Sequence, residues 1–199
     1  MALIQTDFKY VIGFSSVSHM GLVMIGMAAL NKEGLLGAGM QMFSHGVMTA
    51  LFFAVVGMVY DQAHTRQIPE LSGFRKVMPL VALAFIVGGL VSMGMPGFSG
   101  FVAEFPIFMG VWQAQWLVAV IASISIVITA AYIMMNIRKV FFAELPEKLE
   151  GHVGDVTVLD KVAIVTLCLL MVGIGLFPGL MVPMVQTGVE NILRLLGGA

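Results

Sequence analysis

Long apolar segments follow one another along most of the chain and are separated by short polar ones. A helix needs about 20 apolar residues to cross about 30 Å of hydrocarbon. On this measure the pattern predicts six transmembrane helices, at residues 10–30, 35–60, 77–95, 99–112, 116–137 and 162–182. The predicted fold class is all-α, a polytopic bundle of about six transmembrane helices, one of them discontinuous.

The discontinuous helix is the one at residues 99–112, which is too short to cross a membrane alone. It lies between a Gly- and Pro-rich run at 94–100 and a polar segment at 113–115. This pattern is typical of a broken helix, in which freed backbone groups are satisfied inside the protein. The segment 116–137 either continues this helix or starts a fresh crossing, and the sequence permits both.

The composition agrees with a membrane protein. Hydrophobic residues make up 59% of the 199 residues and charged residues 11%, with a mean hydropathy of +1.01. Soluble domains carry roughly 25% charged residues, so the chain is predicted to be an integral membrane protein surrounded by lipid. The net charge of −1 gives no basis for binding nucleic acid. A single cysteine excludes an internal disulfide, and no metal-ligand spacing, phosphate loop or cofactor site is visible, so no cofactor and no metal are expected.

The polar connections are the segments 61–76 and 138–161, and Pro178 and Pro183 predict the end or a kink of the last helix. Six crossings place both termini on one side of the membrane. The ten lysines and arginines then divide five against five, so the excess of positive charge that marks cytoplasmic loops does not decide the orientation.

Glu104 is the most informative residue in the chain. It is the only Asp, Glu, Lys, Arg or His between Val77 and Ile137. A carboxylate at membrane depth costs several kcal/mol unless something uses or neutralises it. Burial favours the neutral carboxyl and a nearby cation favours the carboxylate, which together make a switchable proton site. The alternative is a structural carboxylate that caps the helix break or pairs with a basic neighbour.

Two histidines are candidates for a proton relay with Glu104. His19 lies about 13 Å into its predicted helix and His45 about 15 Å into the next, which runs antiparallel, so the two imidazoles are expected at similar depth. Histidine changes charge near neutral pH and both donates and accepts hydrogen bonds. The alternative is that each histidine only ties helices together. Lys9 is either at the edge of a channel or an interfacial lysine whose charge reaches the membrane surface.

These residues lie in motifs that resemble a known family. The motifs are QTDFK at 5–9, FSSVSHMG at 14–21, QMFSHG at 41–46, HTR with LSG at 64–73, and GMPGFSGFVAEF at 94–105. They are similar to segments of the antiporter-like membrane subunits of proton-pumping NADH:quinone oxidoreductase, complex I, and of Mrp-type cation/proton antiporters. Within this family, L- and N-type subunits have lysine at the position of Glu104, and L-type subunits have a further lysine at the position of Thr49. The chain therefore resembles the M type.

The resemblance implies a half-channel in which protons move along charged residues and water. Glu104 would be its terminal carboxylate, His45 and His19 its relay members, and Lys9 a further member with a less defined role. The electron chemistry would take place in other subunits. The resemblance also admits a subunit of an Mrp-type sodium/proton antiporter or of a membrane-bound hydrogenase, and a structural subunit that conducts nothing is a further alternative.

The family fold contains two inverted repeats of five helices, and this chain matches only its last six helices. Residues 1–199 are therefore expected to form one membrane domain, with a five-helix repeat at 10–140 and a final helix at 162–182. The chain is expected to be a fragment or one half of a split subunit. Its expected partners are other membrane subunits, including whatever supplies the N-terminal repeat, in a bacterial plasma membrane.

Overall fold

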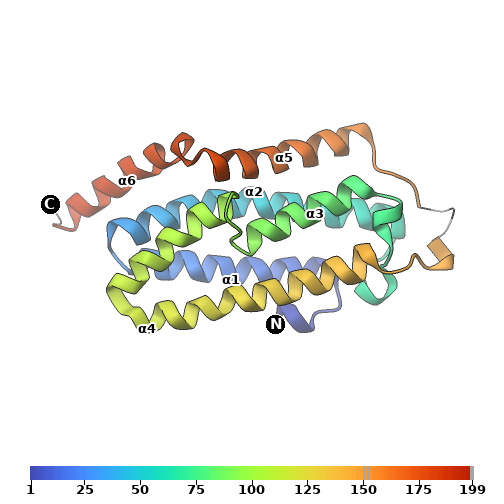
Figure 1. The fold of residues 1–199 in the computed structure, drawn as a ribbon, viewed down its shortest axis with the longest axis horizontal. Helices are drawn as coiled ribbons and strands as arrows, with labels where there is room; N and C mark the ends of the chain where they lie inside the picture. The colour runs from blue at the N-terminus through green and yellow to red at the C-terminus, as the bar shows by residue number, and fades with distance from the viewer. Residues whose placement is uncertain (150, 152, 198–199) are drawn as a thin grey trace.

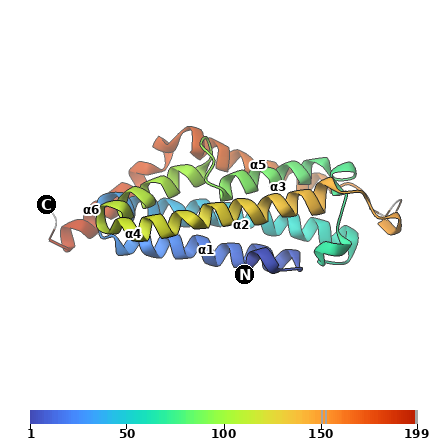
Figure 2. The same cartoon turned by 60° about the horizontal axis from the view of Figure 1, so that its bottom comes forward.

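The structure is a computed structural model that describes residues 1–149, 151 and 153–197. Six α-helices form the bundle in Figures 1 and 2: α1 (Phe8–Ala28), α2 (Lys32–Ala63), α3 (Pro79–Ser92), α4 (Ser99–Asn136), α5 (Val158–Leu176) and α6 (Val182–Leu195). A π-helical turn, η4 (Ile137–Phe142), extends α4, and short 3-10 turns occupy several connections. The described residues form no strand, so the predicted all-α class is confirmed.

Side-chain caps mark where α1 and α2 begin, and the short turn at 29–31 makes the two helices antiparallel neighbours. The carboxylate of Asp7 accepts the N–H groups of Lys9 and Tyr10 and so caps the start of α1. The side chain of Asn31 caps α2 in the same way through Gly34, at 2.9 Å. Its amide also donates to the carbonyl of Gly110 at 2.7 Å, which ties the turn to α4.

Aromatic rings fill the core at the other end of the bundle. The ring of Phe85 on α3 lies 5.3 Å from that of Phe8, 5.0 Å from that of Phe52 and 5.1 Å from that of Phe141. All four side chains are almost completely buried. In lipid the hydrophobic effect gives little attraction between helices, because the surrounding lipid is as apolar as the rings. Dispersion between the closely packed rings therefore holds the helices together at this point.

The predicted helix break lies between α3 and α4. Gly94 adopts a φ of +64°, and the N–H groups of Gly94 and Met95 bond to the carbonyls of Val91 and Leu90. This pattern of bonds closes the C-terminus of α3 and favours glycine at the left-handed position. Beyond the break, α4 starts at Ser99 and continues in roughly the direction of α3 (Figure 1). The two pieces therefore make one crossing in two halves.

The chain then reverses at Gln115, whose φ of −153° and ψ of 84° interrupt α4. The second half of α4 runs back along the bundle, so the segment 116–137 starts a fresh crossing (Figure 1). The described helices therefore run along the bundle in five passes: α1, α2, α3 with the first half of α4, the second half of α4, and α5 with α6. By length and composition, four described helical segments could cross a membrane: Phe8–Ala28, Lys32–Ala63, Ser99–Phe142 and Val158–Leu176. The segments at 77–95 and 99–112, which the sequence pattern counts as two helices, therefore share one pass of the bundle.

This arrangement changes the charge balance of the two ends. The connection at 64–78 and the described part of the connection at 143–157 lie at the same end, because Ser72 donates to the carbonyl of Glu144 and Gln62 accepts the N–H of Gly154. The start of α1 joins them through an ion pair of 3.6 Å between Asp7 and Arg66. This end, named here the basic end, carries eight of the ten cationic residues: Lys9, Arg66, Arg75, Lys76, Arg138, Lys139, Lys148 and Lys161. Lys32 and Arg194 lie toward the opposite end.

The last predicted helix is also broken. Helix α5 ends at Leu176, and α6 begins at Val182 after a turn that contains Pro178. Pro178 and Pro183 therefore interrupt the helix as predicted, but the sequence pattern did not predict α6. Gly175 packs directly against the backbone of residues 97 and 98, so the end of α5 lies against the break between α3 and α4.

Candidate functional site

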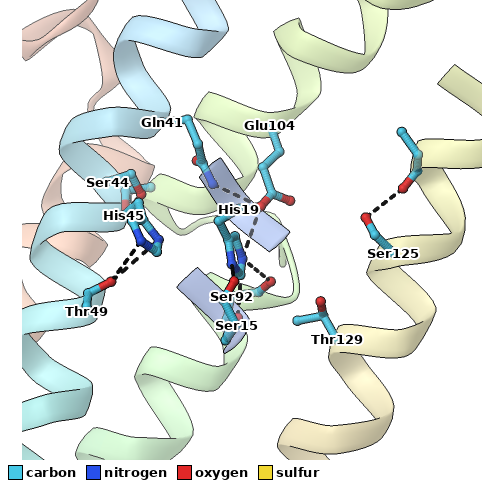
Figure 3. Close-up of polar contacts among 12 residues, drawn as sticks. Ser15, His19, Gln41, Ser44, His45, Thr49, Ser92, Glu104, Ser125 and Thr129 are labelled. Atoms are coloured by element: carbon cyan, nitrogen blue, oxygen red, sulfur yellow. Dashed lines mark hydrogen bonds and ion pairs between the residues drawn. The ribbon is translucent and has the colours of Figure 1, made fainter. Parts of the chain in front are cut away.

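The polar core of the bundle forms where α1 and α4 approach each other beside the helix break (Figure 3). The imidazole Nε2 of His19 on α1 lies 3.6 Å from the carboxylate Oε1 of Glu104 on α4. Both side chains are buried, with 5% and 7% of their surface exposed. Among the described residues, no lysine or arginine pairs with Glu104, so histidine is its ionisable partner there.

The helix break supplies a further partner for His19. The carbonyl of Ser92 ends α3, and the residue four positions later is Pro96, which has no N–H to donate. That carbonyl faces His19 Nε2 at 3.2 Å instead. His19 Nδ1 lies 2.9 Å from the carbonyl of Ser15, one helical turn earlier in α1.

This geometry accommodates two protonation states of His19. Both ring nitrogens face carbonyl oxygens, and only the imidazolium donates from both nitrogens at once. Its positive charge would lie directly against the carboxylate of Glu104. When Nε2 loses its proton, the hydroxyl of Ser92, at 3.4 Å, is placed to donate to it. Each state therefore has hydrogen-bond partners, which a group that gains and loses a proton requires.

The carboxyl of Glu104 is held on its other sides by α2 and by the break itself. The amide of Gln41 donates to Oε1 at 3.2 Å. Gly94 leaves room for Oε2, because a Cβ there would lie 2.8 Å from that oxygen. The amide oxygen of Gln41 is buried and has no hydrogen-bond partner among the described residues. It thus faces the site as an acceptor available to a proton donor.

His45 lies beside His19, and the two rings stack with centroids 5.4 Å apart and planes inclined by 25° (Figure 3). Its Nε2 lies 3.1 Å from the hydroxyl of Thr49. Stacked rings do not direct N–H groups at each other, so transfer of a proton between them needs a bridging water or rotation of one ring. Ser44, next to His45, bonds to Ser99 at 2.8 Å and so fixes α2 against the start of α4.

The structure brings together three of the four residues predicted for the site. The equal depth predicted for His19 and His45 is confirmed by their stacking, and Glu104 is in reach of His19. Lys9 is not in this cluster; its side chain is exposed in the first turn of α1, ten residues before His19. The sequence analysis missed two partners of these residues: the amide of Gln41, which bonds to Glu104, and the carbonyl of Ser92, which faces His19. Gln41 could have been found because it lies one turn before His45 on the same face of α2. The carbonyl of Ser92 could have been found because Pro96, four residues later, has no N–H to bond to it.

Comparisons with known proteins show the family of this chain. The model of the transmembrane family shared by NADH:quinone oxidoreductase and Mrp antiporters matches residues 1–129. The chain belongs to this family. It is 36% identical to NADH-quinone oxidoreductase subunit M of Rhodobacter capsulatus, over 98% of this chain and 38% of that protein. It is also 36% identical to F(420)H(2) dehydrogenase subunit M of Methanosarcina mazei, over 100% of this chain and 40% of that protein.

Among solved structures, a chain of respiratory complex I from Thermus thermophilus superposes with a TM-score of 0.91. It is 28% identical and the match covers 99% of this chain and 41% of that chain. The resemblance to M-type antiporter-like subunits is therefore confirmed. The chain spans about two fifths of the length of these curated relatives, and it matches their C-terminal part.

Proposed function

We propose that this chain is the proton-translocating C-terminal repeat of an M-type antiporter-like subunit of NADH:quinone oxidoreductase. Electrons would pass from NADH to quinone in other subunits, and this chain would carry out the coupled movement of protons. The observation that carries the proposal is the buried pair of His19 and Glu104, 3.6 Å apart and without a lysine or arginine beside it in the described part of the chain.

The proposed path passes from Glu104 to His19 and then to His45. A proton that reaches the carboxyl of Glu104 passes to His19, which leaves an imidazolium against a carboxylate. His19 then releases its proton toward His45, and the restored carboxylate takes up the next proton. Charges at this separation interact by several kcal/mol at an effective dielectric constant of about 20, so each transfer changes the affinity of the neighbouring group for a proton. A change of charge in an adjacent subunit would act on the pair in the same way.

The orientation follows from the corrected charge balance. The basic end carries eight cationic residues and the opposite end two, so the rule that positive loops stay in the cytoplasm places the basic end there. We infer a bacterial plasma membrane, since the subunit M relative from Rhodobacter capsulatus is bacterial. Cysteine introduced at Gly154 should react with an impermeant thiol reagent from the cytoplasmic face, and cysteine at Ala114 from the other face. The reverse result would overturn the orientation.

The partners proposed for this chain are other membrane subunits, including the one that supplies the N-terminal repeat. The support is that the two relatives are named as subunits and that a chain of respiratory complex I shares this fold. On this proposal residues 1–199 form a single domain, the second repeat with its final helix. Copurification of the host complex through a tag on this chain would test it, and recovery of the chain alone would contradict it.

The deciding experiment uses Glu104→Gln in the host complex, in membrane vesicles, with proton pumping and electron transfer measured together. The variant keeps the shape and removes the titratable group, so pumping should fall several-fold in a complex that still assembles. Glu190→Gln, an exposed position on α6, is the matched control and should pump normally. Normal pumping by Glu104→Gln would favour the alternative of a structural, non-conducting subunit.

A second candidate function shares the proton path but uses another electron donor. The relative from Methanosarcina mazei is equally similar and is named for F(420)H(2). Vesicles supplied with NADH or with F(420)H(2) distinguish the two, because only the true donor should drive pumping that Glu104→Gln reduces. Proton movement driven by a sodium gradient without either donor would instead indicate an Mrp-type antiporter.

A further inference from the structure

A second set of buried hydroxyl groups lies next to the proposed relay and is not used by it. Ser15 on α1 has its hydroxyl 2.6 Å from that of Tyr132 on the second half of α4. The hydroxyl of Tyr132 in turn donates to that of Thr129 at 3.5 Å. The exposed fractions of the three residues are 2%, 2% and 4%. Three connected hydroxyls are therefore buried between α1 and the second half of α4.

Two cavities lie on either side of these hydroxyls. A small cavity of about 10 Å³, close to the volume that one water needs, is lined by His19, Ser92, Glu104 and Thr129. A groove of about 350 Å³ between α1 and α4 is lined by Thr129 and Tyr132, with apolar residues around them. Residues common to both are Ser18, Ser125 and Thr129. A wall made of hydroxyl-bearing residues thus separates the groove from the carboxyl of Glu104.

The hydroxyls lie on one side of the relay only. Ser15 is one turn closer than His19 to the basic end, and Tyr132 is ten residues from Phe142, where η4 reaches that end. Toward the opposite end an apolar cluster of Leu22, Ile107, Val111 and Ala119 fills the space between α1 and α4. Beyond it, Gly110 packs directly against the backbone of Gly34. Polar access to Glu104 is therefore built toward the basic end and closed toward the other.

We propose that the groove between α1 and α4 is the water-filled entrance through which protons reach Glu104 from the basic end, with Tyr132 and Thr129 as the proton-passing groups. This inference rests on the proposed function of the site. A hydroxyl accepts a proton on its oxygen and releases its own on the far side. A proton delivered by water in the groove to Tyr132 would thus release one through Thr129 into the small cavity. Each hydroxyl group then rotates back to its starting orientation, so that one proton has passed and both side chains are chemically unchanged. Ser15 positions the phenol and does not itself face the small cavity.

The first test removes single hydroxyls in the host complex. Thr129→Val and Tyr132→Phe should each slow proton pumping several-fold, and Thr129→Ser should restore it. Matched controls are Thr166→Val, whose hydroxyl bonds to its own helix on α5, and Tyr60→Phe, an exposed phenol on α2; both should pump normally. Normal pumping by both Thr129→Val and Tyr132→Phe would overturn the proposal.

The second test asks whether the groove is wet. In a Cys168→Ser background, cysteine at Ser18 or Ser125 should react with a polar, membrane-impermeant thiol reagent added on the side of the basic end. Cysteine at Met24, exposed on the same helix but outside the groove, is the control and should stay unreactive in lipid. Equal failure at all three positions would show that the groove is dry and would overturn the proposal, even if the hydroxyl variants were impaired.

Glu104→Gln, measured in the same vesicles, separates this inference from the proposed function. If Glu104→Gln stops pumping while the hydroxyl variants pump normally, the relay stands and the entrance is elsewhere. If Glu104→Gln pumps normally, the proposed function itself fails, and the entrance proposal fails with it.

Discussion

The contact between α2 and α4 offers a sharp test of how the site is held. Gly37 on α2 faces α4 at the turn that carries Glu104. A Cβ added at Gly37 would lie 2.6 Å from the backbone nitrogen of Ile107 and 2.8 Å from the carbonyl oxygen of Ala103. These are backbone atoms, which cannot rotate away as a side chain can. In Gly37→Ala the two helices must therefore move apart.

The size of the movement can be worked from these distances. Ordinary contact for a Cβ begins at 3.4 Å, so the separation must grow by about 0.8 Å. Gln41 is one turn along α2 from Gly37, and a movement of this size along its 3.2 Å hydrogen bond to Glu104 would lengthen that bond to about 4.0 Å. This exceeds the range of a hydrogen bond. Overpacking of this kind costs about 1–3 kcal/mol, against a gain of up to about 1 kcal/mol from the better helix propensity of alanine.

The assay compares the temperature at which the purified host complex loses half its activity and the proton pumping rate below that temperature. Gly37→Ala should lower both. Gly57→Ala on the same helix is the control, because a Cβ there meets no atom within 4 Å, and it should be neutral or slightly stabilising. If Gly37→Ala and Gly57→Ala behave alike in both measurements, the close approach of α2 and α4 and its link to Glu104 are refuted.

Four further predictions concern the edges of the site and the basic end. Lys9→Gln should pump normally, because Lys9 is exposed and outside the cluster; a loss as large as that of Glu104→Gln would restore Lys9 to the relay. Asp7→Ala should destabilise the complex by about 1 kcal/mol through loss of the cap of α1, and Asp7→Asn by less, as thermal inactivation would show; equal losses would contradict the capping role. Gly94→Ala should impair pumping more than Gly46→Ala, because it strains a φ of +64° and crowds the carboxyl of Glu104; the pumping rates of the two variants check this. The hydrogen bond from Lys161, at 2.6 Å, lowers the pKa of Asp155 from its usual value of 3.8, so this pair should add stability above about pH 4 and lose it as the pH falls further; Asp155→Asn should abolish that part of the acid sensitivity in thermal scans.

Much of the fold could be predicted from the sequence because the apolar segments match the length of a membrane crossing. The bodies of α1 and α2 were predicted on this basis, and the Gly- and Pro-rich run at 94–100 predicted the break. The direction of the chain after the break could not be predicted, because local hydropathy is the same whether the segment 116–137 continues a crossing or starts one. Helix α6 was missed for a related reason: it is amphipathic, and a search for long apolar segments passes over it.

The candidate site, too, could be predicted only in part. The rise per residue along two antiparallel helices predicted that His19 and His45 would lie at the same depth. Glu104 could be predicted as a site residue because it is the only ionisable residue in a long apolar stretch. Ser15, Tyr132 and Thr129 could not be joined from sequence, because Ser15 and Tyr132 are 117 positions apart and hydroxyls are common on membrane helices. Only the packing of α1 against the second half of α4 brings them together.

The helix break explains why the site forms at this depth. A continuous helix would satisfy the carbonyl of Ser92 internally, and Pro96 prevents this, so a backbone acceptor is left for His19. A side chain at position 94 would crowd the carboxyl of Glu104, and a glycine with positive φ both ends α3 and leaves that room. The same six-residue break, at 93–98, that costs helical hydrogen bonds thus provides a partner for the imidazole and space for the carboxyl. On the proposed function, the buried acid and base exchange a proton here, and their partners are backbone carbonyls for His19 and the amide of Gln41 for Glu104 rather than a fixed counter-charge.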